Sequence, residues 1–127
     1  MISIALVDDE QSILASVSLA LEAEGYEVDT FHNGLEALNA LEKNNYDLGL
    51  FDIKMPKMDG NELLSKVRNS KKTHLKEMPI IFLTSKDQEQ DEIIGLRMGA
   101  ADYITKPFSQ KLLNERIRTV LRIYQNR

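Results

Sequence analysis

The sequence predicts an α/β fold, with one five-stranded parallel sheet in the strand order 2-1-3-4-5 and helices on both faces. Three observations predict it. Short apolar runs alternate five times with segments whose apolar residues recur at helical spacing. Several of these runs are apolar from end to end, as strands buried on both faces are. Right-handed crossovers between parallel strands leave few topologies, of which this order is the common one at this size.

The first half of the chain contains three of the predicted strands and two of the helices. The run before Asp8 is apolar, and the run at 27–31 alternates polar and apolar residues, as a half-buried edge strand does. Gly25 and the pair Asn33-Gly34 supply stop and turn signals between the elements. We therefore predict strands at 2–7, 27–31 and 46–51, and helices at 11–24 and from 34 to about 43.

The second half contains two further strands and three helices. A helix around Leu64 ends in the polar stretch 68–77, which we interpret as a helix end plus an exposed loop. On the next helix Ile93, Ile94 and Leu96 are spaced for burial. We predict strands at 78–83 and 102–105, and helices at 87–98 and from 110 to about 125.

Length and composition indicate one globular domain over residues 1–127, with 43% hydrophobic and 28% charged residues. The chain has no Cys, which excludes disulfides, thiolate metal sites and a cysteine nucleophile. No apolar run approaches the length of a membrane span and no signal peptide is apparent, so we expect no membrane partner and a cytoplasmic location. The net charge of −4 gives no general electrostatic case for nucleic acid as a direct partner. We interpret the late basic residues as a solvated helix face: Lys111, Arg116, Arg118, Arg122 and Arg127.

Reactive side chains follow four of the five predicted strands. They are Asp8 and Asp9 after the first, Asp52 after the third, Thr84 after the fourth and Lys106 after the fifth. Because the carboxyl ends of parallel strands meet at one edge, these groups should face a common crevice. Three crowded carboxylates are costly unless a cation intervenes or one carboxyl takes up a proton. We therefore predict a hard divalent cation, Mg2+, at this edge.

Each acid taken alone has another interpretation, because Asp8 or Asp9 could cap the helix that begins at Gln11. The joint arrangement favours chemistry. Lys106 would counter the charge of a group bound at Asp52, and Thr84 would donate a hydrogen bond to the same group. An acid, a metal, a hydroxyl and an ammonium around a carboxylate describe a phosphoryl-transfer site with Asp52 as the nucleophile.

Four motifs give the chain a family resemblance. LVDDE, LGLFDIKMPKMDG, IIFLTS and GAADYITKPF, in this order, resemble the receiver domain of two-component response regulators, and most of all the OmpR/PhoB-like class. The resemblance covers the whole chain. It implies the CheY-like (flavodoxin-like) fold, Mg2+-dependent acceptance of a phosphoryl group from a sensor histidine kinase, slow self-dephosphorylation, and signalling in the cytoplasm by a switch that is not a multiple-turnover enzyme.

The resemblance also implies a role for particular residues. Asp52 matches the phosphoacceptor, and the metal ligands are Asp8, Asp9, Asp52 and the backbone carbonyl of Lys54. Further matches are the switch residues Thr84 and Tyr103, the phosphate-contacting Lys106, a cis Lys106-Pro107 peptide bond, and Lys54 and Lys86 at positions that influence hydrolysis. Taken alone, Tyr103 is more typical of a half-buried strand aromatic than of a switch residue. His32 and His74 fall in segments predicted to be exposed and match no family site.

Receivers of this class form homodimers on phosphorylation through the fourth long helix, the fifth strand and the last helix, joined by inter-subunit salt bridges. Asp102 and Arg116 match one such pair. Where the class has a basic residue, its acidic partner and a second Asp, this chain has Glu92, Leu112 and Ala101. Either the dimer uses more apolar contact on this face, or its geometry differs.

The resemblance further implies transcriptional output through a C-terminal winged-helix DNA-binding domain, which lies outside residues 1–127. A stand-alone receiver and a domain of a longer protein are both compatible with the sequence. Two other functions remain open. An aspartyl-phosphate hydrolase of haloacid-dehalogenase type would use the same groups, but that family has a second acid two residues after the nucleophile, where this chain has Lys54. A flavodoxin-like cofactor binder would need a phosphate-binding loop where this chain has Asp8-Asp9-Glu10.

Overall fold

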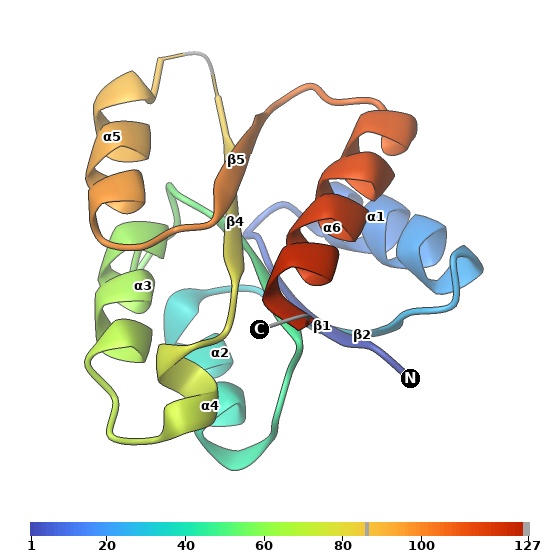
Figure 1. Cartoon of the computed structure of the whole chain (residues 1–127). Helices are drawn as coiled ribbons and strands as arrows, with labels where there is room; N and C mark the ends of the chain where they lie inside the picture. Colours follow the sequence, from blue (N-terminus) through green and yellow to red (C-terminus); the bar gives the residue numbers. More distant parts are fainter. Residues whose placement is uncertain (86, 126–127) are drawn as a thin grey trace.

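The structure is a computed structural model that describes residues 1–85 and 87–125. Its centre is a single parallel sheet with the strand order β2-β1-β3-β4-β5 (Figure 1). The strands are β1 (Ser3–Val7), β2 (Glu27–Phe31), β3 (Leu48–Asp52), β4 (Ile80–Thr84) and β5 (Asp102–Thr105). Register is regular: Val7 pairs with Phe51 across β1 and β3, and Asp52 pairs with Leu83 across β3 and β4. The predicted fold class and strand order are confirmed.

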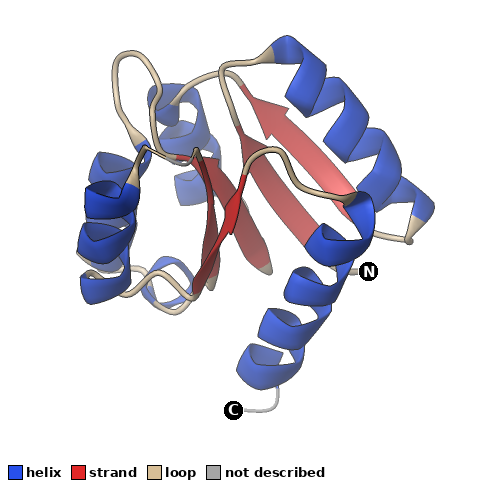
Figure 2. Ribbon diagram, turned by 90° about the horizontal axis from the view of Figure 1, so that it is seen from above, coloured by secondary structure: helices blue, strands red, loops and turns tan. Residues whose placement is uncertain are grey.

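The helices form a layer on each side of the sheet (Figures 1 and 2). One face is covered by α1 (Gln11–Ala23) and α6 (Gln110–Gln125). The other is covered by α2 (Gly34–Lys43), α3 (Gly60–Arg68), α4 (Thr73–Lys76) and α5 (Glu89–Arg97). Within the described residues, none of these helices combines the length and the apolar character that a membrane crossing requires.

Alternate residues of each strand supply the two hydrophobic cores, because successive side chains of a strand point to opposite faces. In β4, Ile80 and Phe82 pack toward α3 and α5, whereas Ile81 and Leu83 pack toward α1 and α6. All four are at most 1% exposed. This alternation also decides toward which helices the last residue of each strand points.

The predicted element bounds agree with the structure to within two residues at most ends. The edge strand β2 and the strand β5 have the predicted bounds, and the helix after Asn33 begins where the turn signal placed it. Asn33 caps α2, since its side chain accepts a hydrogen bond from the amide of Glu36. The two central strands begin two residues later than predicted and include their polar last residues, Asp52 and Thr84.

The prediction that residues 68–77 form only a helix end and an exposed loop is wrong. The segment contains the short helix α4, whose Leu75 is 1% exposed, and it continues into buried Met78. Arg68 stabilises this segment, because its guanidinium donates hydrogen bonds to the backbone carbonyls of Leu75 and Gly99. His74 is only partly exposed, with its ring nitrogen 3.4 Å from the carbonyl oxygen of Leu41.

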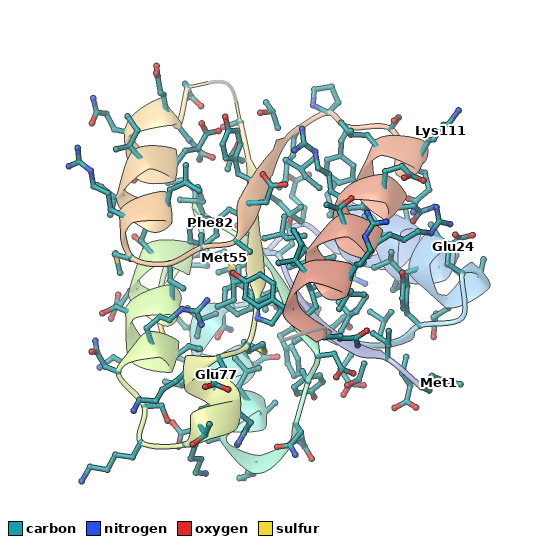
Figure 3. All side chains as sticks on the ribbon, in the orientation of Figure 1. Met1, Glu24, Met55, Glu77, Phe82 and Lys111 are labelled. Carbon is teal, nitrogen blue, oxygen red and sulfur yellow. The ribbon has the colours of Figure 1, made fainter. Side chains whose placement is uncertain are left out.

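The predicted burial of Ile93, Ile94 and Leu96 is also wrong, since these side chains are 37–45% exposed. The buried residue of α5 is Gly95. A Cβ atom at Gly95 would collide with the ring of Phe82, which lies between β4 and α5 (Figure 3). The helix therefore packs on the sheet through its smallest residue, and its larger apolar side chains lie on the surface.

Leu35 of α2 and Leu112 of α6 are exposed apolar side chains as well. The basic residues of α6 lie on an exposed face, as predicted, within the part of the helix that the structure describes. Arg118 there forms ion pairs with Glu24 and Glu115. Arg127 lies outside the described residues.

Candidate metal centre at the carboxyl edge of the sheet

Three carboxylates meet where β1 and β3 end side by side. Asp8 and Asp9 follow β1, and Asp52 is the last residue of β3. One oxygen from each lies within 4.8 Å of the others. Carboxylate oxygens are the ligands that hard divalent cations prefer, so the donor set fits Mg2+. A pocket of about 290 Å³ opens beside them and is lined by Asp9, Glu10, Asp52, Lys54, Ser85, Gln88 and Lys106.

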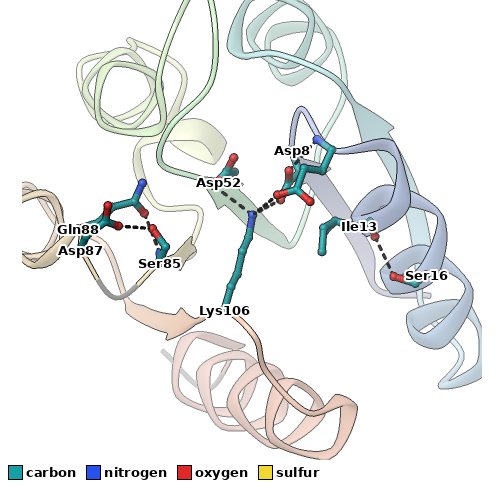
Figure 4. Close-up of polar contacts among 9 residues, drawn as sticks. Asp8, Ile13, Ser16, Asp52, Ser85, Asp87, Gln88 and Lys106 are labelled. Carbon is teal, nitrogen blue, oxygen red and sulfur yellow. Dashed lines mark hydrogen bonds and ion pairs between the residues drawn. The ribbon is translucent and has the colours of Figure 1, made fainter.

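Lys106 crosses from the end of β5 to these carboxylates (Figure 4). Its Nζ donates to Asp8 Oδ2 at 2.8 Å and to Asp52 Oδ1 at 3.4 Å, and lies 3.8 Å from Glu10 Oε1. Burial alone would lower the pKa of Lys106, but its hydrogen bond to Asp8 and the charge of Asp52 outweigh burial and raise the pKa. The ammonium therefore stays charged and offsets part of the repulsion among the acids.

Asp52 is more deeply placed than its position at a strand end suggested. It is the last residue of β3, yet it is only 5% exposed. Burial, with the negative charge of Asp8 next in importance, raises its pKa to about 7 despite the opposing effect of Lys106. Asp52 is thus a carboxyl group whose ionisation at neutral pH depends on the cations around it.

Asp8 has a local role as well, although it does not cap α1: the N-cap residue of that helix is Glu10, and no side chain makes a capping hydrogen bond there. Its Oδ1 accepts a hydrogen bond from the amide of Glu10, the residue that precedes α1. The other oxygen binds Lys106. This buried carboxylate therefore stabilises the turn before α1 and faces the site, and the interpretation of Asp8 or Asp9 as a cap of α1 is wrong.

Thr84 lies at the same sheet edge, but its hydroxyl is not directed to the carboxylates. The residue is fully buried, and its Oγ1 donates to Glu92 Oε1 of α5 at 2.6 Å. Strand alternation explains this, because Thr84 has the same parity as Phe82 and so faces α5 rather than α1 and α6. Sequence reasoning noted Glu92 only as a departure from the family pattern; its spacing of eight residues from Thr84 gave no signal of this contact.

The remaining predicted residues lie around this centre. Tyr103 is 37% exposed on β5, and the Lys106–Pro107 peptide bond is cis. Asp102 Oδ2 lies 3.1 Å from Arg116 Nη1 of the same chain. The ammonium of Lys54 lies 3.1 Å from Asp91 Oδ2 of α5, a partner that sequence reasoning did not identify. Lys86 lies outside the described residues.

Two glycines allow the loop after β3 to pack closely against its neighbours. The amide of Gly60 donates to the carbonyl of Ile53 at 2.8 Å. A Cβ at Gly60 would lie 2.5 Å from the carbonyl oxygen of Asp52 and 2.9 Å from the Cα of Ile53. On the other side, a Cβ at Gly34 would lie 2.6 Å from the carbonyl oxygen of Met58. The close approach of α3 to β3 therefore requires glycine at position 60.

We expect Gly60→Ala to lower the free energy of unfolding by about 1–3 kcal/mol, the usual cost of overpacking, because the obstructing atoms are backbone. It should also weaken Mg2+ binding measured by calorimetry, since the displaced backbone carries Asp52 and leads to the Lys54 carbonyl. Gly25→Ala is the matched control. Gly25 has a φ of 94° and open space around it, so alanine there should cost about 1–2 kcal/mol without changing Mg2+ affinity. Equal Mg2+ affinities for both variants would contradict the prediction.

The fold and this edge define a doubly wound α/β protein whose acids and lysine converge on one small site. Comparison with known protein families agrees with this description and identifies the family. The chain belongs to the response regulator receiver domain family, which it matches over residues 4–118. None of the matches supports a hydrolase of haloacid-dehalogenase type.

Similar proteins place the chain within this family. It is 43% identical over 119 residues to the alkaline phosphatase synthesis transcriptional regulatory protein PhoP of Bacillus subtilis, covering 94% of this chain and 48% of that protein. It is 41% identical to the regulatory protein VanRc of Enterococcus gallinarum, covering 96% and 51%. The resemblance to OmpR/PhoB-like regulators is thereby confirmed. The chain spans about half the length of these curated relatives.

Solved structures agree. The CheY-like response regulator receiver domain protein of Methanospirillum hungatei superposes with a TM-score of 0.92 at 35% identity, covering 99% of this chain and 98% of that one. The chemotaxis protein CheY4 of Vibrio cholerae gives a TM-score of 0.87 at 34% identity, covering 94% and 98%. The CheY-like fold is shown by these likenesses.

Proposed function

We propose that this receiver domain accepts a phosphoryl group on Asp52 from a sensor histidine kinase, in a reaction that requires Mg2+. The observation that carries the proposal is the position of Asp52, a buried carboxylate within 4.8 Å of two further acids and beside the Lys106 ammonium. The pocket of about 290 Å³ next to it is large enough for a phosphoryl group.

The proposed step is an in-line displacement at phosphorus. A carboxylate oxygen of Asp52 forms the new bond to phosphorus while the bond from phosphorus to the imidazole nitrogen of the kinase phosphohistidine breaks. The bonding electron pair returns to that nitrogen, and the product is an acyl phosphate. Lys106 binds a phosphoryl oxygen and offsets its negative charge, after its contact with Asp52 opens. Later attack by water on phosphorus regenerates the carboxylate and releases inorganic phosphate, slowly and once per phosphorylation.

Four groups would hold the metal: the carboxylates of Asp8, Asp9 and Asp52 and the backbone carbonyl of Lys54. When bound, Mg2+ supplies positive charge to the phosphoryl oxygens. Among the described residues, Lys106 is the cation in contact with these acids, and one positive charge against three carboxylates favours uptake of a divalent ion.

The downstream events follow from the family. A phosphoryl group at Asp52 would draw in Thr84 and then Tyr103, and so alter the surface formed by α5, β5 and α6. A homodimer on that surface, cytoplasmic location and transcriptional output through a C-terminal winged-helix domain complete the proposal. Its support is that the relatives are transcriptional regulators about twice as long as this chain. The contact between Asp102 and Arg116 within one chain would have to open if these residues join two subunits.

Intact-mass spectrometry after incubation with a small phosphodonor tests the proposal. With Mg2+ present, the protein should gain one phosphoryl group per chain, and with EDTA none. Beryllofluoride, which imitates a bound phosphoryl group, should shift the mass in solution from monomer to dimer. Absence of any mass gain in Mg2+ would contradict phosphoacceptor function, and continuous turnover of a phosphate ester would contradict the switch.

A further inference from the structure

We propose that Glu92 is a positioning residue, which holds the Thr84 hydroxyl away from the phosphoryl site and must be displaced before Thr84 can bind a phosphoryl group. The inference rests on the proposed function. It gives this chain a specific resistance to activation, built from the residue that stands where the family resemblance led us to expect a basic side chain.

The first step is that the two acceptors exclude one another. A threonine hydroxyl has one proton and donates one hydrogen bond at a time. In the structure that proton goes to Glu92 Oε1 at 2.6 Å, the short distance typical of a charge-assisted bond. Thr84 is fully buried, so water does not compete for it. A phosphoryl oxygen at Asp52 can therefore gain this donor only if Glu92 loses it.

The second step is that α5 is held where its carboxylate meets Thr84. Gly95 packs directly on the ring of Phe82, two residues before Thr84 on β4. From α3, the Asn61 side chain donates to the carbonyl of Asp91 at 3.5 Å. Glu92 is itself partly buried. The close packing of α5 thus limits how far the carboxylate can move without displacement of the helix.

The third step concerns the other polar contacts between α5 and the site in the described part of the chain. Gln88, which precedes α5, accepts a hydrogen bond from the amide of Ser85 at 2.8 Å, but this contact fixes the loop before the helix rather than Glu92. The pair between Lys54 and Asp91 is the alternative, but its lysine side chain is 62% exposed, and exposed ion pairs contribute little. Loss of the Thr84 bond would therefore remove a buried polar contact of α5 and make a shift of the helix against Asn61 and Phe82 easier. Movement of Thr84 toward Asp52 and movement of α5 become one event, in which the Glu92 carboxylate exchanges the hydroxyl for solvent.

Beryllofluoride binding in Mg2+, measured by calorimetry, tests the inference. Glu92→Ala should bind beryllofluoride about tenfold more tightly than the wild type, a change at the lower end of what a charge-assisted hydrogen bond contributes. Glu92→Gln keeps a neutral acceptor and should fall between the two. Glu89→Ala is the matched control, since Glu89 is an exposed acid on the same helix whose side chain makes no hydrogen bond or ion pair within the described residues. It should bind as the wild type does.

Two further measurements separate positioning from a merely structural role. In the Thr84→Val background, Glu92→Ala should no longer tighten beryllofluoride binding, because the competing donor is absent. In the ligand-free wild type, the buried Thr84 hydroxyl proton should give a slowly exchanging proton resonance that Glu92→Ala removes. A structural role alone would lower stability in both backgrounds without tightening binding.

The outcomes distinguish this inference from the proposed function. If the wild type binds beryllofluoride through Asp52 and both Glu92 variants bind with unchanged affinity, the inference is overturned while the proposed function stands. Equal tightening in Glu89→Ala would also overturn it, because net charge would then explain the effect. If the wild type and Asp52→Asn alike show no binding, the proposed function itself fails.

Discussion

Asp52→Asn should take up no phosphoryl group from a small phosphodonor in Mg2+, where the wild type takes up one. The amide lacks the anionic oxygen that attacks phosphorus, and it withdraws one of three charges from the metal site. Intact-mass spectrometry measures the loss directly. Asp47→Asn is a suitable control, because this exposed acid lies at the opposite edge of the sheet, where it accepts a hydrogen bond from the amide of Ser3 at the start of β1. Uptake by Asp52→Asn at the wild-type rate would show that another residue is the acceptor.

The same variant should be more stable than the wild type at about pH 8 in EDTA. In the folded state the pKa of Asp52 is about 7, raised from an ordinary value of 3.8. Between these pH values the folded chain holds a proton that the unfolded chain has released, so wild-type stability falls as pH rises from about 4 to about 7 and the penalty then stays constant. The asparagine side chain does not ionise, so the stability advantage of Asp52→Asn over the wild type should shrink as the pH falls toward about 4.

Urea denaturation of both proteins across this pH range measures the difference in stability, in which the titrations of groups distant from Asp52 cancel. Glu22→Gln, which neutralises an exposed acid on α1, controls for the loss of one negative charge away from the site. Mg2+ should reverse the order at neutral pH, because the ion stabilises the ionised carboxylate of the wild type and finds a weaker site in the variant. A pH-independent difference in EDTA would show that Asp52 is ionised throughout.

Sequence reasoning located this centre because of one simple regularity. In β1 and β3, an apolar run stops at its first acid, and parallel topology brings the ends of such runs to one edge. Asp8, Asp52 and Lys106 could therefore be placed together before any coordinates, and the ammonium does lie within 3.4 Å of both carboxylates. Chain order and periodicity were sufficient for the topology and for these contacts.

What could not be predicted depends on how closely elements approach one another. Ile93 and Ile94 are exposed because α5 packs on Phe82 through Gly95. The spacing of apolar residues in the sequence does not predict this contact. The direction of the Thr84 hydroxyl follows from strand parity together with the position of Glu92. The burial of Asp52, and hence its raised pKa, arises from elements that pack around the edge from several parts of the chain. These are properties of packing in three dimensions rather than of local pattern.

Lys106→Met should lower the free energy of unfolding by about 3–5 kcal/mol at neutral pH in EDTA, the usual cost of removing one partner of a buried ion pair. Methionine retains most of the side-chain volume, so the effect is electrostatic. Without the ammonium, Asp8 is left fully buried beside Asp52 with no cation in contact among the described residues. Removal of Lys106 also removes the opposing influence on the pKa of Asp52, which should rise further.

Mg2+ should restore much of the lost stability, because a divalent ion among the three carboxylates replaces the missing charge. The deficit should also be smaller at about pH 5, where a proton on Asp52 relieves the repulsion. Arg118→Met provides the comparison: its ion pairs with Glu24 and Glu115 are exposed, so the loss should be about 0.2–1 kcal/mol and independent of Mg2+. A deficit in Lys106→Met that Mg2+ leaves unchanged would mean that the three acids do not share a metal.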